Sequence, residues 1–284
     1  MVMSDAKGVA IETDGHLTWL KWHRGHRLAG DISFTRQRIA EGMALGASVE
    51  IDLVCFADDG FAVLHDDVLH PATTGEGAVA NASADYLSSL YLRDHEGQPT
   101  SHPVMLIDDL GRLLKEIACH PDAVLQLDLK EYSVRISEAD VAVFAKAITP
   151  VAKSVILSGG DAVAVERLSR AVPTMPVGYD PCHDGAIERL MESRDFAGFV
   201  SGALEASPKA TMIYLHHKLV LFADATGFDM IGAFHQAGRT IDAYTINRAI
   251  PDVLPDVRRL LALKADQITT DDPVGLEALI ASSH

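Results

Sequence analysis

WLKWHRGHRL, residues 19–28, places a short apolar run directly before a histidine, an arginine and a glycine. The apolar run is typical of a β-strand with a buried face. A strand that only filled a core would not need His23 and Arg24 at its end. The stretch therefore predicts a strand whose C-terminal end carries chemistry, with Gly25 letting the backbone come close to a ligand.

Similar apolar runs alternate with helical patterns along most of the chain. The predicted strands are 17–23, 48–54, 123–130, 154–158, 176–180, 211–217, 240–246 and 266–270. The predicted helices are 33–46, 108–118, 137–148, 161–171, 184–193, 224–238, 252–263 and 274–282. Repeated strand–helix alternation is typical of parallel strands with crossover helices, and this count predicts an α/β fold, a (β/α)8 TIM barrel. A doubly wound sheet is the alternative, but no Gly-rich nucleotide loop follows the first strand.

Two segments fit this rhythm less well. Residues 197–204, AGFVSGAL, form a further candidate strand, and residues 61–65, FAVLH, are expected to pair near the second strand. Residues 66–103 are rich in Ala, Ser, Thr, Gly and His, and we expect a small insertion with little regular structure there. Residues 1–284 are otherwise predicted to be a single domain, because the length suits one barrel.

The composition limits the classes of partner. The 284 residues are 48% hydrophobic and carry a formal net charge of −16. This charge disfavours nucleic acid and anionic membranes, so local cations must capture an anionic ligand. No apolar run approaches the length of a membrane span, and the acidic N-terminus does not resemble a signal peptide. Three widely spaced cysteines suggest neither a disulfide framework nor a zinc site, so we expect a cytoplasmic protein without stable membrane association.

Two carboxylates share one face of the second predicted strand. Glu50 and Asp52 are two residues apart in SVEIDLV, so they project together while Val49, Ile51 and Leu53 face the other way. Their mutual repulsion and desolvation are usually relieved by a divalent cation. An edge strand with outward-facing acids is the alternative, which the predicted parallel sheet disfavours.

The third predicted strand repeats this arrangement in LQLDLK. Asp128 and Lys130 share a face, so Asp128 could be a third oxygen ligand and Lys130 a cation for an anionic substrate. An ordinary ion pair within the strand is the alternative. His65 ends another apolar run, and two histidines titrating near neutrality could divide general-acid and general-base work. In barrels such residues gather at the C-terminal ends of the strands.

The order and spacing of these motifs resemble the glycerophosphodiester phosphodiesterases, which belong to the phospholipase-C-like phosphodiesterase barrels. The motifs are HRG (23–25), EID (50–52), LHDD (64–67), LDLK (127–130) and ITTDDP (268–273). The resemblance implies these roles: His23 and His65 as the acid/base pair, Glu50 and Asp52 as metal ligands, and Arg24 and Lys130 as phosphate contacts. Asp128 stands where the family usually has a glutamate.

Three departures concern the leaving-group side of the site. A PENT-like segment usually follows HRG, whereas this chain has LAGDISFT at 28–35. The family's Trp-Thr-Val-Asn-like motif is YTIN here, so Tyr244 takes the aromatic, substrate-binding position. A Ser-Phe pair on the fourth strand is replaced by Ser158 and Gly159. These changes make a sugar phosphodiester of the agrocinopine type an alternative to a glycerol head group.

The resemblance thus implies a phosphoric diester hydrolase of lipid metabolism. It would use one divalent cation, Mg²⁺ or Ca²⁺, to hydrolyse a small-molecule glycerophosphodiester to an alcohol and a glycerol phosphate. Hard oxygen ligands favour these two metals over softer ones. The alternatives are a sphingomyelinase-D-like phospholipase, which would need an exposed apolar loop, and a ligand-binding barrel without turnover, which would not need both His23 and His65. The sequence does not predict an oligomeric state.

Overall fold

The structure is a computed structural model that describes residues 7–282, and the chain divides into two compact units. We call Arg24–His26 with Gly30–Pro176 the central unit, and the described parts of Met1–His23, Arg27–Ala29 and Val177–His284 the terminal unit. Residues 1–6 and 283–284 of the predicted 1–284 domain lie outside the described residues. That the chain forms a single domain therefore stays a prediction.

Three parallel strands form the sheet of the central unit. They are β3 (Ser48–Cys55), β7 (Val124–Leu129) and β8 (Val155–Gly159), in the order β8-β7-β3. Every residue of β3 is buried, as expected for a strand covered on both faces. The register aligns Asp52 with Asp128 and Asp128 with Ser158, which puts three polar side chains on one rung. As predicted, FAVLH pairs with the second predicted strand, through the two-residue β4 (Phe61–Ala62), which is antiparallel to β3.

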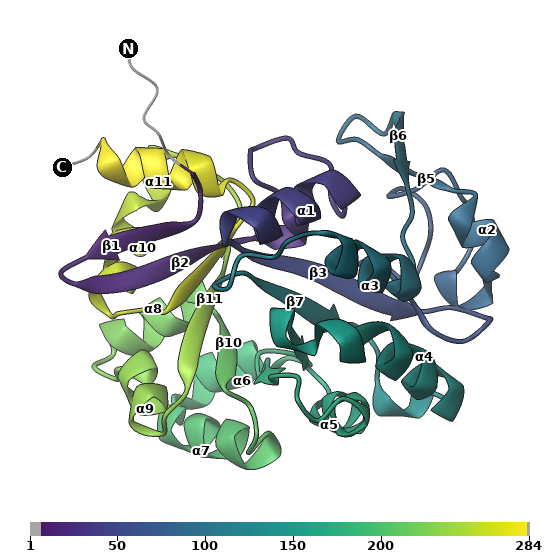
Figure 1. Ribbon diagram of the computed structural model, residues 1–284. Coiled ribbons are helices and arrows are strands. Elements are labelled where there is room, and N and C mark those ends of the chain that lie inside the picture. The colour runs from purple at the N-terminus through teal and green to yellow at the C-terminus, as the bar shows by residue number, and fades with distance from the viewer. Residues whose placement is uncertain (1–6, 283–284) are drawn as a thin grey trace. The chain divides into compact units, whose positions relative to one another are not determined.

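Four α-helices of the central unit connect or flank these strands, and the sequence predicts where three of them begin. They are α1 (Arg36–Leu45), α3 (Ile107–Glu116), α4 (Glu138–Ile148) and α5 (Ala162–Ala171). Side chains of Thr35, Ser137 and Asp161 cap the N-termini of α1, α4 and α5 by accepting backbone N–H bonds. Helices α3 and α4 pack against each other (Figure 1).

The predicted insertion at 66–103 contains more regular structure than we expected. It holds the 3₁₀ helix η2 (Val79–Asn81), the helix α2 (Ala84–Ser88) and the antiparallel pair β5 (Tyr91–Arg93) and β6 (Pro99–Pro103). Each element is five residues or shorter. Periodicity cannot identify elements of this length from sequence.

Five parallel strands form the sheet of the terminal unit. In spatial order they are β2 (His16–Trp22), β12 (Gln267–Thr270), β11 (Thr240–Ile246), β10 (Met212–His216) and β9 (Gly178–Tyr179). The strand β1 (Ala10–Thr13) forms a hairpin with β2. Its turn, Asp14-Gly15, has φ of 51° and 73°, the left-handed geometry that Asp-Gly favours in two-residue hairpins.

Six helices belong to the terminal unit. They are α6 (Ala186–Ser193), α7 (Phe196–Ala206), α8 (His217–Ala225), α9 (Met230–Gln236), α10 (Leu254–Ala262) and α11 (Pro273–Ala281). The candidate strand AGFVSGAL is wrong, because residues 197–204 lie in α7. Its buried Phe196, Val200 and Ala203 follow the i, i+4, i+7 spacing of a helix face, and Asp195 caps its start.

The helix predicted at 224–238 is interrupted. Asp224 and Ala225 end α8, and Asp229 caps the start of α9 by accepting from the Gly232 N–H. His217 begins α8, so the predicted strand at 211–217 extends one residue too far. All eight predicted barrel strands are otherwise present, each within two residues of its predicted bounds.

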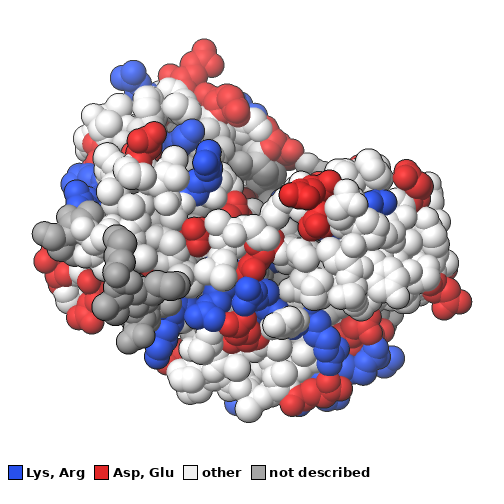
Figure 2. All heavy atoms as spheres, turned by 90° about the horizontal axis from the view of Figure 1, so that it is seen from above, with Lys and Arg blue, Asp and Glu red and all other residues white. Residues whose placement is uncertain are grey.

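The charge of the chain is distributed in mixed fashion over the face that Figure 2 shows, where Lys and Arg lie among Asp and Glu. Within residues 7–282, no helix is long and apolar enough to cross a membrane.

Candidate metal and phosphate site

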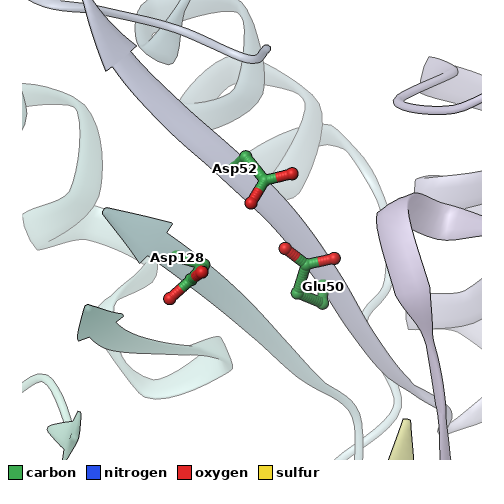
Figure 3. Close-up of side chains that lie close together, drawn as sticks. All are labelled: Glu50, Asp52 and Asp128. Carbon is green, nitrogen blue, oxygen red and sulfur yellow. The ribbon is translucent and has the colours of Figure 1, made fainter. Parts of the chain in front are cut away.

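Three carboxylates meet in the central unit, and we call Glu50, Asp52 and Asp128 the acidic triad. One oxygen from each lies within 4.8 Å of the others. Figure 3 shows Glu50 and Asp52 on β3 and Asp128 on the neighbouring β7. The arrangement follows from the alternation of β3 and from the register that pairs Asp52 with Asp128. Glu50 and Asp52 are buried, so they are not the outward-facing acids of an edge strand.

Two cationic side chains border the acidic triad. Lys130 Nζ lies 2.5 Å from Asp128 Oδ2 and 3.0 Å from Asp52 Oδ1, so the Asp128–Lys130 ion pair, the alternative interpretation of this motif, is part of a larger network. Arg24 Nε lies 3.5 Å from Asp52 Oδ2, and the Arg24 backbone N–H donates to Glu50 Oε2 at 2.7 Å. The backbone turns sharply here, with φ of 53° at Arg24 and 75° at Gly25. The glycine of HRG is thus needed for this turn.

The three carboxylates of the acidic triad outnumber the two cations, Arg24 and Lys130, that lie beside them. Burial, followed by repulsion from Glu50, raises the pKa of Asp52 from 3.8 to about 7, although Lys130 opposes the change. Burial lowers the pKa of Lys130 and the carboxylates of Asp128, Asp52 and Glu50 raise it, with a net increase. Asp52 Oδ2 is buried and accepts no hydrogen bond. Three hard oxygen donors with an unsatisfied buried oxygen fit a Mg²⁺ or Ca²⁺ ion.

A chain of hydrogen bonds holds the third carboxylate in place. Gln126 Nε2 donates to Ser158 Oγ at 2.8 Å, and Ser158 Oγ donates to Asp128 Oδ1 at 2.8 Å. From the sequence alone, Ser158 is only a departure from the family pattern. Ser158 lies on β8, in register with Asp128 on β7 and Asp52 on β3. The contact between Ser158 and Asp128 can therefore be predicted only when the strand order is known.

His65 forms a carboxylate pair in the central unit. His65 Nδ1 lies 2.8 Å from Asp66 Oδ1, and both side chains are partly exposed. With Nδ1 bonded to the carboxylate, Nε2 is the nitrogen available for proton transfer. Asp66 was quoted in the LHDD motif but had no predicted role.

His23 forms a similar pair in the terminal unit. His23 Nδ1 lies 2.6 Å from Asp271 Oδ1, and Asn247 Nδ2 donates to Asp271 Oδ2 at 2.9 Å. The three residues follow β2, β11 and β12 at their C-terminal ends, where barrel enzymes place their chemistry. Asp271 and Asn247 come from the quoted motifs ITTDDP and YTIN, although neither had a predicted role. The chain joins His23 directly to Arg24 of the acidic-triad network.

Tyr244, the predicted substrate contact, also lies in the terminal unit. Its hydroxyl lies 2.9 Å and 3.1 Å from the two carboxylate oxygens of Asp180. Its ring makes an edge contact with His216, and its carbonyl is 2.9 Å from His217 Nδ1. Desolvation by burial is the largest cause that lowers the pKa of both histidines below the usual value of the imidazole. The other predicted site residues, Arg24, Glu50, Asp52, His65, Asp128 and Lys130, lie together in the central unit.

A second buried charge cluster lies inside the terminal unit. Lys21 Nζ is 3.0 Å from Asp242 Oδ2 and 4.4 Å from the centre of the Tyr214 ring. Asp242 also accepts hydrogen bonds from Gln267 and Thr269. These residues sit on β2, β10, β11 and β12, and the sequence analysis assigned them no role.

Comparison with known proteins identifies the family of the chain and solved structures with a similar fold. The family model described as Glycerophosphoryl diester phosphodiesterase family matches residues 23–274. A glycerophosphoryl diester phosphodiesterase from Parabacteroides distasonis is 18% identical with a TM-score of 0.64, and the match covers 99% of this chain and 92% of that one. A glycerophosphodiester phosphodiesterase from Agrobacterium tumefaciens is 18% identical with a TM-score of 0.63, covering 92% and 99%.

An Oleispira antarctica phosphodiesterase, solved with its product sn-glycerol-3-phosphate, is 18% identical with a TM-score of 0.65; the match covers 92% of this chain and 96% of that one. No curated protein matches the chain. The likeness to the solved structures shows the fold, so the predicted (β/α)8 barrel is confirmed.

Proposed function

Since the chain belongs to the glycerophosphoryl diester phosphodiesterase family and is a phosphoric diester hydrolase, we propose that it hydrolyses a glycerophosphodiester with one divalent cation. The products would be an alcohol and a glycerol phosphate. The single observation that carries the metal requirement is the buried Asp52 oxygen, which accepts no hydrogen bond within the acidic triad.

Glu50, Asp52 and Asp128 would hold the cation, Mg²⁺ or Ca²⁺. When bound, such an ion neutralises the charge that develops on the phosphoryl group during the reaction. Arg24 and Lys130 would hold the non-bridging phosphate oxygens, because both already lie beside the acidic triad. A guanidinium and an ammonium supply the local positive charge that a chain of net charge −16 otherwise lacks.

His23 and His65 would divide the proton transfers. Each imidazole is bonded through Nδ1 to a carboxylate, His23 to Asp271 and His65 to Asp66, which fixes the ring and its tautomer. Each ring would therefore use Nε2 for proton transfer with a reacting oxygen. One Nε2 would accept the proton of the nucleophile and the other would protonate the leaving oxygen. Tyr244 would present its ring to the substrate.

The other classes of function predict different results. A sphingomyelinase-D-like phospholipase would prefer a substrate with an acyl chain, and a ligand-binding barrel would show no turnover. We further propose that the protein is cytoplasmic, acts in lipid metabolism and does not associate stably with membranes.

Hydrolysis of a diester panel tests the proposal. Glycerophosphocholine, glycerophosphoethanolamine, glycerophosphoinositol and lysophosphatidylcholine would each be incubated with Mg²⁺, Ca²⁺ or EDTA. We expect metal-dependent release of a glycerol phosphate, lost in His23→Ala. His235→Ala is the matched control. His235 also pairs with a carboxylate, because its Nε2 lies 2.7 Å from Asp266 Oδ2, but it precedes the N-terminal end of β11, whereas Asn247 follows the C-terminal end. Equal loss in both variants, or turnover in EDTA, would contradict the proposal.

A further inference from the structure

We infer that Asp180 is a positioning residue for the proposed reaction: it holds the hydroxyl of Tyr244 and thereby fixes the ring that Tyr244 presents to the substrate. This inference rests on the proposed function, in which Tyr244 contacts the diester. Both residues lie in the terminal unit. Asp180 follows β9 and Tyr244 lies on β11, so the pair joins two strands that are separated by β10.

The turn after β9 orients the Asp180 carboxylate. Asp180 Oδ1 accepts from the Cys182 N–H at 2.7 Å, which is the hydrogen bond of an Asx turn. The Asp180 carbonyl lies 2.9 Å from His183 Nδ1, and the His183 ring makes an edge contact with Tyr179. These contacts do not involve Tyr244. The carboxylate is therefore fixed by its own turn before it meets the tyrosine.

Tyr244 is held at both of its ends. Its hydroxyl lies 2.9 Å from Asp180 Oδ2 and 3.1 Å from Oδ1, and its carbonyl lies 2.9 Å from His217 Nδ1. The pairing of β11 with β12 is irregular between Ala243 and Ile246, and such irregularities re-aim a side chain. Because the ring is tied at its hydroxyl and at its backbone, its rotational freedom is lost on folding and not on binding.

The other neighbours of the Tyr244 ring are weaker partners for its hydroxyl. Burial, followed by the charge of Asp180, raises the pKa of the Cys182 thiol to about 12. A neutral thiol is a weak acceptor, whereas a carboxylate is a strong one. His216 contacts Tyr244 through its ring, edge-on with 5.8 Å between the ring centres, and its buried Nδ1 forms no hydrogen bond. Asp180 is therefore the stronger acceptor among these neighbours.

The tether determines what Tyr244 offers to a substrate. The side chain is half-buried, so part of the ring is accessible. With the hydroxyl engaged by Asp180, the diester would meet the ring carbons and pack against them. Asn247 follows the same end of β11 and donates to Asp271, the partner of His23. The fixed ring thus lies at the end of the strand that also supports the proposed proton-transfer pair.

A purely structural link between β9 and β11 is the alternative to a positioning role. Loss of such a link would lower the free energy of unfolding and leave KM unchanged. Loss of a tether that orients a substrate contact would raise KM, because the ring must then be ordered again when the diester binds. Kinetics and unfolding of the same variants therefore distinguish the two roles.

The variants are Tyr244→Phe, Asp180→Ala, the combination of these two, and Asp180→Asn. Asparagine keeps a side-chain oxygen that accepts from the Tyr244 hydroxyl and from the Cys182 N–H. Tyr179→Phe is the matched control, because it removes a phenol hydroxyl next to Asp180, keeps the ring that contacts His183 and leaves the Asp180–Tyr244 bond in place.

Three diesters serve as probes: glycerophosphocholine, glycerophosphoethanolamine and glycerophosphoinositol. We would measure kcat and KM for each with Mg²⁺ or Ca²⁺, and the urea midpoint of each variant. Calorimetry would measure the Kd of the same diesters for the His23→Ala variant, alone and combined with each substitution.

We expect Tyr244→Phe and Asp180→Ala each to raise KM and Kd about tenfold while kcat changes no more than about threefold. The combined variant should be no worse than Asp180→Ala alone, since both changes remove the same bond. Asp180→Asn and Tyr179→Phe should change KM no more than about twofold.

Additive losses in the combined variant, or an equal loss in Asp180→Asn and Asp180→Ala, would overturn the inference while leaving the proposed function intact. A lower urea midpoint with an unchanged KM in Tyr244→Phe would do the same. The expected pattern of Kd values without hydrolysis of any diester would support the positioning role and overturn the proposed function. A parent that neither hydrolyses nor binds these diesters would overturn both.

Discussion

Replacing Asp52 by asparagine tests whether the acidic triad is a charge cluster that needs a cation. Burial, followed by repulsion from Glu50, raises the Asp52 pKa from 3.8 to about 7. The difference between these values corresponds to about 4 kcal/mol of unfavourable free energy when Asp52 is ionised. The folded chain holds this proton more tightly than the unfolded chain does. Relative stability is therefore highest below about pH 4 and falls as the pH rises through 7.

The asparagine side chain keeps the shape of Asp52 and removes its charge. At pH 8 in EDTA, we expect Asp52→Asn to be more stable than the parent by up to about 4 kcal/mol, because the raised pKa of Asp52 already includes its attraction to Lys130. At pH 5 the folded Asp52 is protonated but the unfolded side chain is still ionised, so the gain should shrink to less than half of its pH 8 value. At pH 8, Mg²⁺ or Ca²⁺ should stabilise the parent and leave the variant unchanged.

Urea unfolding followed by circular dichroism, at pH 5 and pH 8 with EDTA or metal, would measure these differences. Asp242→Asn is the matched control, since Asp242 is as buried as Asp52 but is satisfied by Lys21, Gln267 and Thr269. It should destabilise the chain at both pH values and leave the metal effect in place. A lower urea midpoint for Asp52→Asn at pH 8 in EDTA, or equal metal stabilisation of the parent and this variant, would refute the reasoning.

Three further predictions concern positioning and buried charge. Ser158→Ala should weaken Mg²⁺ or Ca²⁺ binding about tenfold by freeing Asp128, measured by calorimetry; unchanged affinity would remove Ser158 from the site. Asp271→Asn should lower kcat by at least about 100-fold with little change in KM, because the His23 tautomer is no longer fixed. A kcat near the parent value would show that the His23–Asp271 pair is only structural. Lys21→Met should cost about 3–5 kcal/mol in urea unfolding by leaving a buried carboxylate unpaired, and a loss below about 1 kcal/mol would contradict this.

Most of the barrel strands could be predicted because their sequences are short, apolar and bounded by helix caps. Ser137 and Asp161 cap helices where the sequence places them, and Gly46 ends α1 in the left-handed conformation. The prediction of a strand at 197–204 is wrong because the segment is short and mostly apolar, and periodicity does not separate such a helix from a buried strand. The Asp14-Gly15 dipeptide is itself a hairpin signal, because Asp-Gly favours the two-residue turn that joins β1 to β2.

The acidic triad could be predicted in part from a single strand. Glu50 and Asp52 share a face by their spacing alone, whereas the approach of Asp128 depends on β7 lying beside β3 in the observed register. The support of Asp128 by Ser158 requires a third strand, and the pairing of His23 with Asp271 joins residues 248 positions apart. Such contacts depend on tertiary register, which the local pattern of one strand does not specify.

The two buried charge clusters of this chain differ in whether the protein satisfies them, and this difference separates structure from function. In the terminal unit, Asp242 has an ammonium and two hydrogen-bond donors, so the Lys21 cluster is complete within the chain. In the central unit, Lys130 and Arg24 approach Asp52, yet one of its buried oxygens accepts no hydrogen bond and its pKa is raised to about 7. Burying an unsatisfied carboxylate is costly, and it persists where a ligand supplies the missing charge. The central cluster is therefore the one for which we propose a bound cation and a phosphate, whereas the terminal cluster is satisfied by the protein alone.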